Sequence, residues 1–182
     1  MEGARSVVRE KNAGHGILQG GGTICAESDF YEGKAENVND ENATILLTAA
    51  VTHSLDPASP NVPGMIPQPV AWLKEYETPE GTGSGLSFCT TFGSSCDFDD
   101  GNLRRLLINA AFFLTGVEVP AETDVSYIDP FEASAYTNHR TSDYYRELNL
   151  KPADYGYGKS PQTGPSLEKM IQEGNQKAGP LP

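Results

Sequence analysis

The stretch of sequence that decides the fold runs from residue 69 to residue 116 and opens with PVAWLKEYE at residues 69–77. Val70, Trp72 and Tyr76 alternate there with polar or small neighbours, a period of two that predicts a β-strand. After the turn TPEGTGSG, the run LSFCTTF at residues 86–92 is aromatic and β-branched. It predicts a second strand, paired with the first in a hairpin.

The same stretch continues into a helical pattern, DFDDGNLRRLLINAAFFLTG, at residues 97–116. Its carboxylates are of the type that caps a helix N-terminus, and Gly116 is a natural C-terminal cap. The apolar positions follow the spacing i, i+3, i+4, which predicts a helix that packs on a sheet. Three positions outside this spacing are also apolar, namely Ile108, Phe112 and Phe113. We therefore expect this helix to be covered on most sides.

Outward from this block the signals weaken. The segment ATILLTAAVT at residues 43–52 predicts a buried strand, whereas residues 1–42 hold only a short candidate strand around GGTICAE, at residues 21–27. Beyond Pro120 we expect mostly loop, with a brief strand in DVSYID (124–129), a helical turn in TSDYYREL (141–148) and a short helix in SLEKMIQEG (166–174). Three clear strands and one helix indicate half of the sheet that a layered α/β domain contains.

Composition sets wider bounds on the function. The chain has 182 residues and a formal net charge of -12, with only 13 Lys and Arg. Nucleic acid and anionic membrane surfaces both need clustered cations, so neither is an expected partner. No apolar stretch reaches the ~18 residues of a membrane span, and no signal-peptide core is evident; the compartment stays open. The cysteines favour reduced thiols, with a single bridge between Cys89 and Cys96 as the alternative.

The order of these motifs resembles the trehalose-utilisation (ThuA-like) domain family of the class I glutamine amidotransferase-like superfamily. GHGILQGGGTICAESDFYE (14–32) is similar to its His-containing turn and the acidic, tyrosine-bearing stretch that follows. The block from Pro69 to Gly116 is similar to its "P-x-A-W" strand, Thr-x-Gly turn and "RRLLxNA" helix, and the similarity runs from His15 to Tyr157. DVSYIDPFEASAYTNHRT (124–141) and KPADYGYG (151–158) resemble the tail of one subgroup.

This resemblance implies an α/β fold: a partial flavodoxin-like, three-layer sandwich with a loop-rich C-terminal tail. Residues 1–118 would be the C-terminal portion of the ThuA-like domain and residues 119–182 the extension. The family's first strands, and with them much of its pocket, are expected to be missing from this chain. The shortage of strands counted above agrees with that expectation.

The resemblance also implies a role in carbohydrate utilisation, on trehalose or an oxidised sugar, with a hydrolase-like activity. Many relatives carry a His directly after the Thr-x-Gly turn, where this chain reads Phe92-Gly93-Ser94-Ser95-Cys96-Asp97. We therefore expect the activity to be impaired. The alternative is a non-catalytic or truncated module that acts in binding, or in association through an exposed sheet edge with another chain or a second copy.

The candidate site residues follow from these matches. His15 and Asp97 are the catalytic candidates, and a small carbohydrate is the expected ligand; its binding candidates are Asp29, Tyr31, Gly93, Ser94 and Ser95. Four of them have a structural alternative: His15 as a turn residue, Asp97 as a helix cap, Asp29 and Tyr31 as ordinary surface polarity. No cofactor or metal pattern is present in the sequence. The hydrolase hypothesis requires His15, Asp29 and Asp97 to converge on one pocket.

Overall fold

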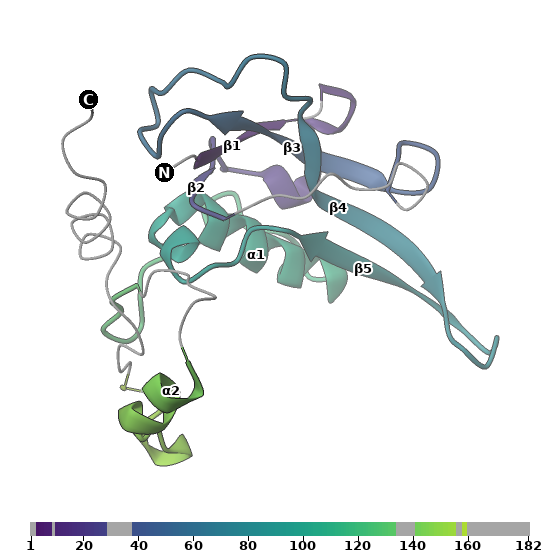
Figure 1. Cartoon of the computed structure of the whole chain (residues 1–182). Helices are drawn as coiled ribbons and strands as arrows, with labels where there is room; N and C mark the ends of the chain where they lie inside the picture. The colour runs from purple at the N-terminus through teal and green to yellow at the C-terminus, as the bar shows by residue number, and fades with distance from the viewer. Residues whose placement is uncertain (1–2, 9, 29–37, 134–140, 156–157, 160–182) are drawn as a thin grey trace.

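A computed structural model describes residues 3–8, 10–28, 38–133, 141–155 and 158–159 of the chain. Its centre is a curled five-stranded sheet with the order β2-β1-β3-β4-β5 (Figure 1). All four neighbouring pairs are antiparallel. The strands are β1 (Gly3–Val8), β2 (Cys25–Ala26), β3 (Thr44–Thr52), β4 (Gln68–Glu77) and β5 (Ser84–Thr90).

One long helix, α1 (Gly101–Leu114), lies against one face of this sheet, and α2 (Ser142–Leu148) lies apart from it (Figure 1). Four short 3-10 turns complete the described elements: η1 (Glu10–Asn12), η2 (Gly16–Leu18), η3 (Cys96–Asp99) and η4 (Pro152–Asp154). Across the described ranges, no helix combines the length and apolar character that a membrane crossing requires.

The strands and helix expected from the central block are confirmed. β4 and β5 form the hairpin through seven consecutive cross-strand pairs, from Ala71 opposite Thr90 to Glu77 opposite Ser84. β3 occupies the predicted apolar segment, and α2 occupies the predicted helical turn. The fold is therefore mixed α/β.

Other expectations differ from the structure. Residues 3–8, expected to be irregular, form β1, because this modest segment GARSVV is held along its whole length by pairing with β3. The segment 124–129 is not a strand; the carbonyl of Val125 instead accepts a hydrogen bond from Arg104 Nε at 2.8 Å. The helix expected at residues 166–174 lies outside the described residues.

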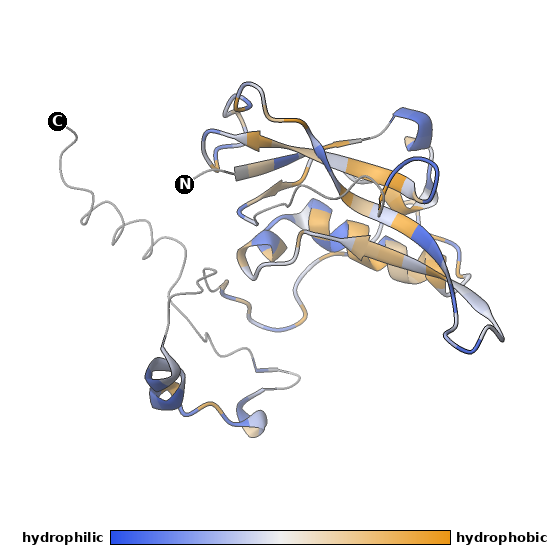
Figure 2. Ribbon diagram, turned by 45° about the vertical axis from the view of Figure 1, so that its right-hand side comes forward, coloured by the Kyte–Doolittle hydropathy of each residue, from blue (hydrophilic) through white to orange (hydrophobic). Residues whose placement is uncertain are grey.

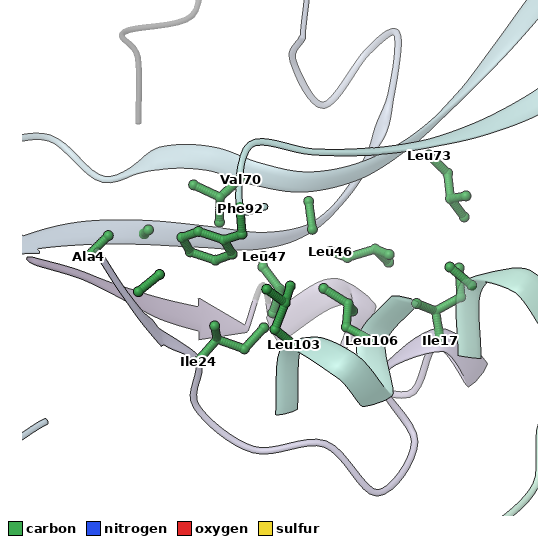
Figure 3. Close-up of a cluster of buried hydrophobic side chains, with 14 residues drawn as sticks. Ala4, Ile17, Ile24, Leu46, Leu47, Val70, Leu73, Phe92, Leu103 and Leu106 are labelled. Carbon is green, nitrogen blue, oxygen red and sulfur yellow. The ribbon is translucent and has the colours of Figure 1, made fainter. Parts of the chain in front are cut away.

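The hydrophobic core fills the space between the sheet and α1 (Figure 3). Leu103 and Leu106 of α1 face Leu46 and Leu47 of β3, while Ile17 of η2 packs at the side of the helix. Figure 2 shows the same division, with hydrophobic residues where sheet and helix face each other and hydrophilic ones at the far end of the β4–β5 hairpin.

The ends of α1 follow the predicted chemistry only in part. Asp100 is the N-cap, since its Oδ1 accepts the N–H of Asn102 at 2.7 Å, and Gly116 ends the helix with φ +72°. The expectation that the helix is covered on most sides is wrong for its last turn. There Phe113 and Leu114 are 37% and 41% exposed.

Candidate functional site

The turn between β5 and α1 is organised around the carboxylate of Asp97, which is buried. Its Oδ1 accepts the N–H groups of Glu27 at 3.0 Å and Ser28 at 3.2 Å, next to the end of β2. Its Oδ2 accepts the N–H groups of Gly93 at 2.9 Å and Ser94 at 3.1 Å, and also the hydroxyl of Ser28. Five donors therefore converge on one carboxylate and tie two distant segments together.

In this geometry two of the predicted binding residues have structural hydrogen-bond partners. The N–H groups of Gly93 and Ser94 point at Asp97, and the Ser94 hydroxyl donates to Glu27 Oε1 at 3.1 Å. Ser95 is the residue that precedes η3 and is half-buried. Because the carboxylate of Asp97 accepts five hydrogen bonds from two distant segments, it acts as a structural clamp between them.

Cys96, beside this clamp, is a poor nucleophile. Burial raises the pKa of its thiol to about 12, and the side chain of Glu27, which bonds the thiol, adds to the increase. The thiolate is the reactive form, so at neutral pH this sulfur is almost entirely protonated. No disulfide joins Cys25, Cys89 and Cys96, so all three are thiols.

His15 lies at the other end of α1, in the loop that leads into η2. Its Nδ1 accepts the N–H of Ile17 at 3.2 Å, and its ring packs against the ring of Phe113, with the centroids 4.7 Å apart. Burial lowers the pKa of His15 from 6.5. The ring is therefore neutral at pH 7, and since Nδ1 is an acceptor, its proton resides on Nε2.

The His15 and Phe113 rings both line a cavity of about 530 Å³, which we call the His15 cavity. Its wall is formed by the last turn of α1, the start of β3 and the distal part of the β4–β5 hairpin. The lining combines apolar groups with polar and acidic ones, among them Asp40, Glu41, Glu75 and Leu86. Asp40 also forms an ion pair with Lys11 at 2.8 Å.

The structure does not bring the two catalytic candidates together. Asp97 precedes the first turn of α1 and His15 contacts its last turn, so the helix rise alone separates them by about 18 Å. Gly93, Ser94 and Ser95 stay with Asp97. Asp29 and Tyr31 lie outside the described residues. In the described part of the chain, therefore, no pocket unites the residues that the hydrolase hypothesis requires.

Sequence reasoning missed the contribution of Glu75, Leu86 and Phe113 to a cavity. The register signal was present, since Glu75 and Leu86 stand opposite each other in the predicted hairpin. The sequence held no signal for the approach of these residues to His15, because that contact depends on how the end of the helix packs against the loop. Among the described residues, no three His, Cys, Asp or Glu side chains gather in a way that could hold a metal ion.

Comparisons with family models, with curated proteins and with solved structures find no match to this chain. The relationship to ThuA-like domains therefore stays a prediction that rests on the motifs quoted above.

The lowered pKa of His15 makes a prediction about acid stability. Between the pKa of the unfolded chain and the lower pKa of the folded one, the unfolded state binds more protons, so stability falls as the pH drops through that interval. His15→Asn keeps a side-chain acceptor for the N–H of Ile17 but does not titrate. We expect urea denaturation at pH 7.5 and pH 5.5 to show a smaller acid-induced loss in the variant. Identical losses in the two proteins would contradict the assignment.

Proposed function

We propose that this chain is a ThuA-like module that binds a small carbohydrate in the His15 cavity and has little or no hydrolase-like activity of its own. The observation that carries the proposal is the pair of rings at one wall of the cavity, His15 against Phe113, facing a rim of carboxylate and amide side chains. An apolar ring face together with a few convergent polar groups is the usual chemistry of a small-molecule site.

The non-catalytic part of the proposal is supported by the separation of the candidate residues. The carboxylate of Asp97 is engaged by its five donors at one end of α1, whereas His15 stands at the other end. The cavity itself does contain a neutral His and carboxylates, but the carboxylates are exposed groups on the rim. A general acid or base would need a partner within hydrogen-bond reach and a matched pKa.

The finer fold assignment belongs to the same proposal: the chain would be the C-terminal portion of a flavodoxin-like, three-layer sandwich. Two features support it. The order of β5, the turn around Asp97 and α1 is a strand–turn–helix sequence, and among the described residues α1 is the helix that lies against the sheet, on one face. The opposite face would then be available for a second helical layer.

The charge of the cavity favours one class of sugar. Asp40, Glu41 and Glu75 place carboxylates on the rim, and Lys11 offsets the charge of Asp40 alone among them. An anionic ligand would meet like charges there. We therefore propose neutral sugars, such as glucose and trehalose, rather than acidic oxidised sugars as ligands.

The experiment is a titration of the purified chain with trehalose, glucose and gluconate, in which binding is measured by saturation-transfer NMR and calorimetry. We expect the two neutral sugars to bind and gluconate to bind more weakly. Phe113→Ala should weaken binding by roughly tenfold, because it removes the ring that stacks on the ligand. Leu114→Ala is the matched control: it is the next residue in the same exposed helix turn and should leave binding unchanged.

Three outcomes would count against the proposal. If none of the three sugars bound, the carbohydrate assignment would be overturned. Equal losses in Phe113→Ala and Leu114→Ala would overturn the site. Release of glucose from trehalose by the wild-type chain, measured in the same samples, would overturn its non-catalytic character.

A further inference from the structure

β5 is the last strand of the sheet, and among the described residues no strand pairs with its outer edge (Figure 1). Its backbone bonds with β4 on one side, through the seven consecutive pairs of the hairpin. On its other side, the N–H and C=O groups of every second residue point away from the sheet. Such an edge is a template for another strand unless the protein protects it.

The sequence of β5, SGLSFCT, contains none of the usual protective devices. It has no Lys or other charged residue and no Pro, and its register with β4 runs without a shift. By contrast, the pairing of β3 with β4 is interrupted by irregularities around Leu47. β5 is therefore a regular, uncharged edge of seven residues in a chain whose net charge is -12.

The opposite edge of the same sheet is treated differently. β2 is only two residues long, and side chains cap the backbone around it. The N–H of Cys25 donates to Asp100 Oδ2 at 2.8 Å, and the N–H groups of Glu27 and Ser28 donate to Asp97. One edge is thus closed by carboxylates, while the described residues supply no comparable cap for the other.

We propose that β5 pairs with β5 of a second copy of this chain, which joins the two sheets across a two-fold axis. Two identical strands related by such an axis and hydrogen-bonded edge to edge are antiparallel, and antiparallel pairing is the pattern of every neighbouring pair in this sheet. The absence of charge on β5 favours its own copy, since two acidic chains repel each other least where neither carries a charge.

The interface is a strand pair with few side chains, so we expect a reversible dimer whose population rises with protein concentration. Sedimentation velocity over a wide concentration range measures this directly. Hydrogen exchange adds a local readout: outward-pointing amides of β5 should become more protected as the concentration rises. The amides that already bond β4 should show little change.

The disruptive variant is Ser84→Lys/Leu86→Lys. These positions stand opposite Glu77 and Glu75 on β4, so each new Lys gains a cross-strand ion pair and the hairpin is retained. Leu86 is 40% exposed, so its replacement opens no core cavity. In the dimer, however, the two copies would bring four Lys side chains to one seam, and we expect dimerisation to weaken by at least about tenfold.

The matched control is Met65→Lys/Ile66→Lys, which makes the same change in net charge in the loop between β3 and β4, where the side chains are 55% and 77% exposed. It should dimerise as the wild type does. A wild-type chain that stays monomeric at all concentrations would overturn the proposal. So would equal weakening by both variants, or protection that rises with concentration at the Met65 loop and not in β5.

Discussion

Replacing Asp97 with alanine is expected to lower the free energy of unfolding by about 3 kcal/mol or more, the largest effect of any single carboxylate in the described structure. The reason is the asymmetry of buried hydrogen bonds. The change removes one acceptor group: the N–H groups of Glu27, Ser28 and Gly93 lose it, and the N–H of Ser94 keeps only the Ser28 hydroxyl oxygen at 3.3 Å. Urea denaturation monitored by circular dichroism measures the loss.

Asp99→Ala is the control for this experiment. Asp99 lies two residues further along in the same 3-10 turn, is exposed, and accepts one contact, from the hydroxyl of Tyr127 at 3.3 Å. Its replacement should cost less than about 1 kcal/mol. If the two variants were destabilised equally, the clamp role of Asp97 would be refuted, and capping charge in the turn would explain both.

The second large effect is expected at Asn109, which is completely buried on the inner side of α1. Its Nδ2 donates to the carbonyls of Ile17 at 3.1 Å and Gln19 at 2.9 Å, and its Oδ1 accepts the hydroxyl of Thr123 at 2.7 Å. Asn109→Leu keeps a side chain of similar length but removes all three hydrogen bonds, two of which are buried. We expect a loss of about 2–3 kcal/mol in the free energy of unfolding.

Asn102→Leu separates this effect from the general cost of removing an Asn from α1. Asn102 also bridges two backbone groups, the carbonyl of Thr23 at 3.0 Å and the N–H of Gly22 at 2.9 Å, but those bonds are exposed to water. Its loss should be clearly smaller, because water can replace the side chain. Comparable losses in the two variants would show that burial is not what makes Asn109 important.

Asn109 also connects stability to the proposed site. The carbonyls that it holds belong to the segment that directly follows His15, and the His15 ring lines the His15 cavity. Loosening this segment should therefore increase hydrogen exchange around residues 16–19. If neutral sugars bind as proposed, Asn109→Leu should weaken their binding even though Asn109 is not among the residues that line the cavity.

How much of this could be predicted from the sequence depended on the range of the interactions. β3, β4, β5 and α1 were all predicted, because each shows its own period of apolar residues and its own end signals. Asp100 and Gly116 act as the expected caps for the same reason, since a cap is decided by residues within one helical turn. β1 was missed, because GARSVV has little pattern of its own and is held by β3.

The roles of the candidate site residues could not be predicted from the sequence. Asp97, Ser94 and His15 were identified as residues of interest, but their roles depend on contacts between distant parts of the chain. Asp97 meets Ser28 across 69 positions, and His15 meets Phe113 only where the end of α1 and the loop pack together.

The sequence by itself therefore determined the hairpin, the buried strand and the helix, because local periodicity and end residues are sufficient for them. Only the tertiary structure decided that Asp97 is a clamp, that His15 and Phe113 line a cavity, and that β5 remains at the edge of the sheet. The reason is that these features depend on contacts between residues far apart in the sequence, and only the packing of the whole fold decides which groups lie next to each other.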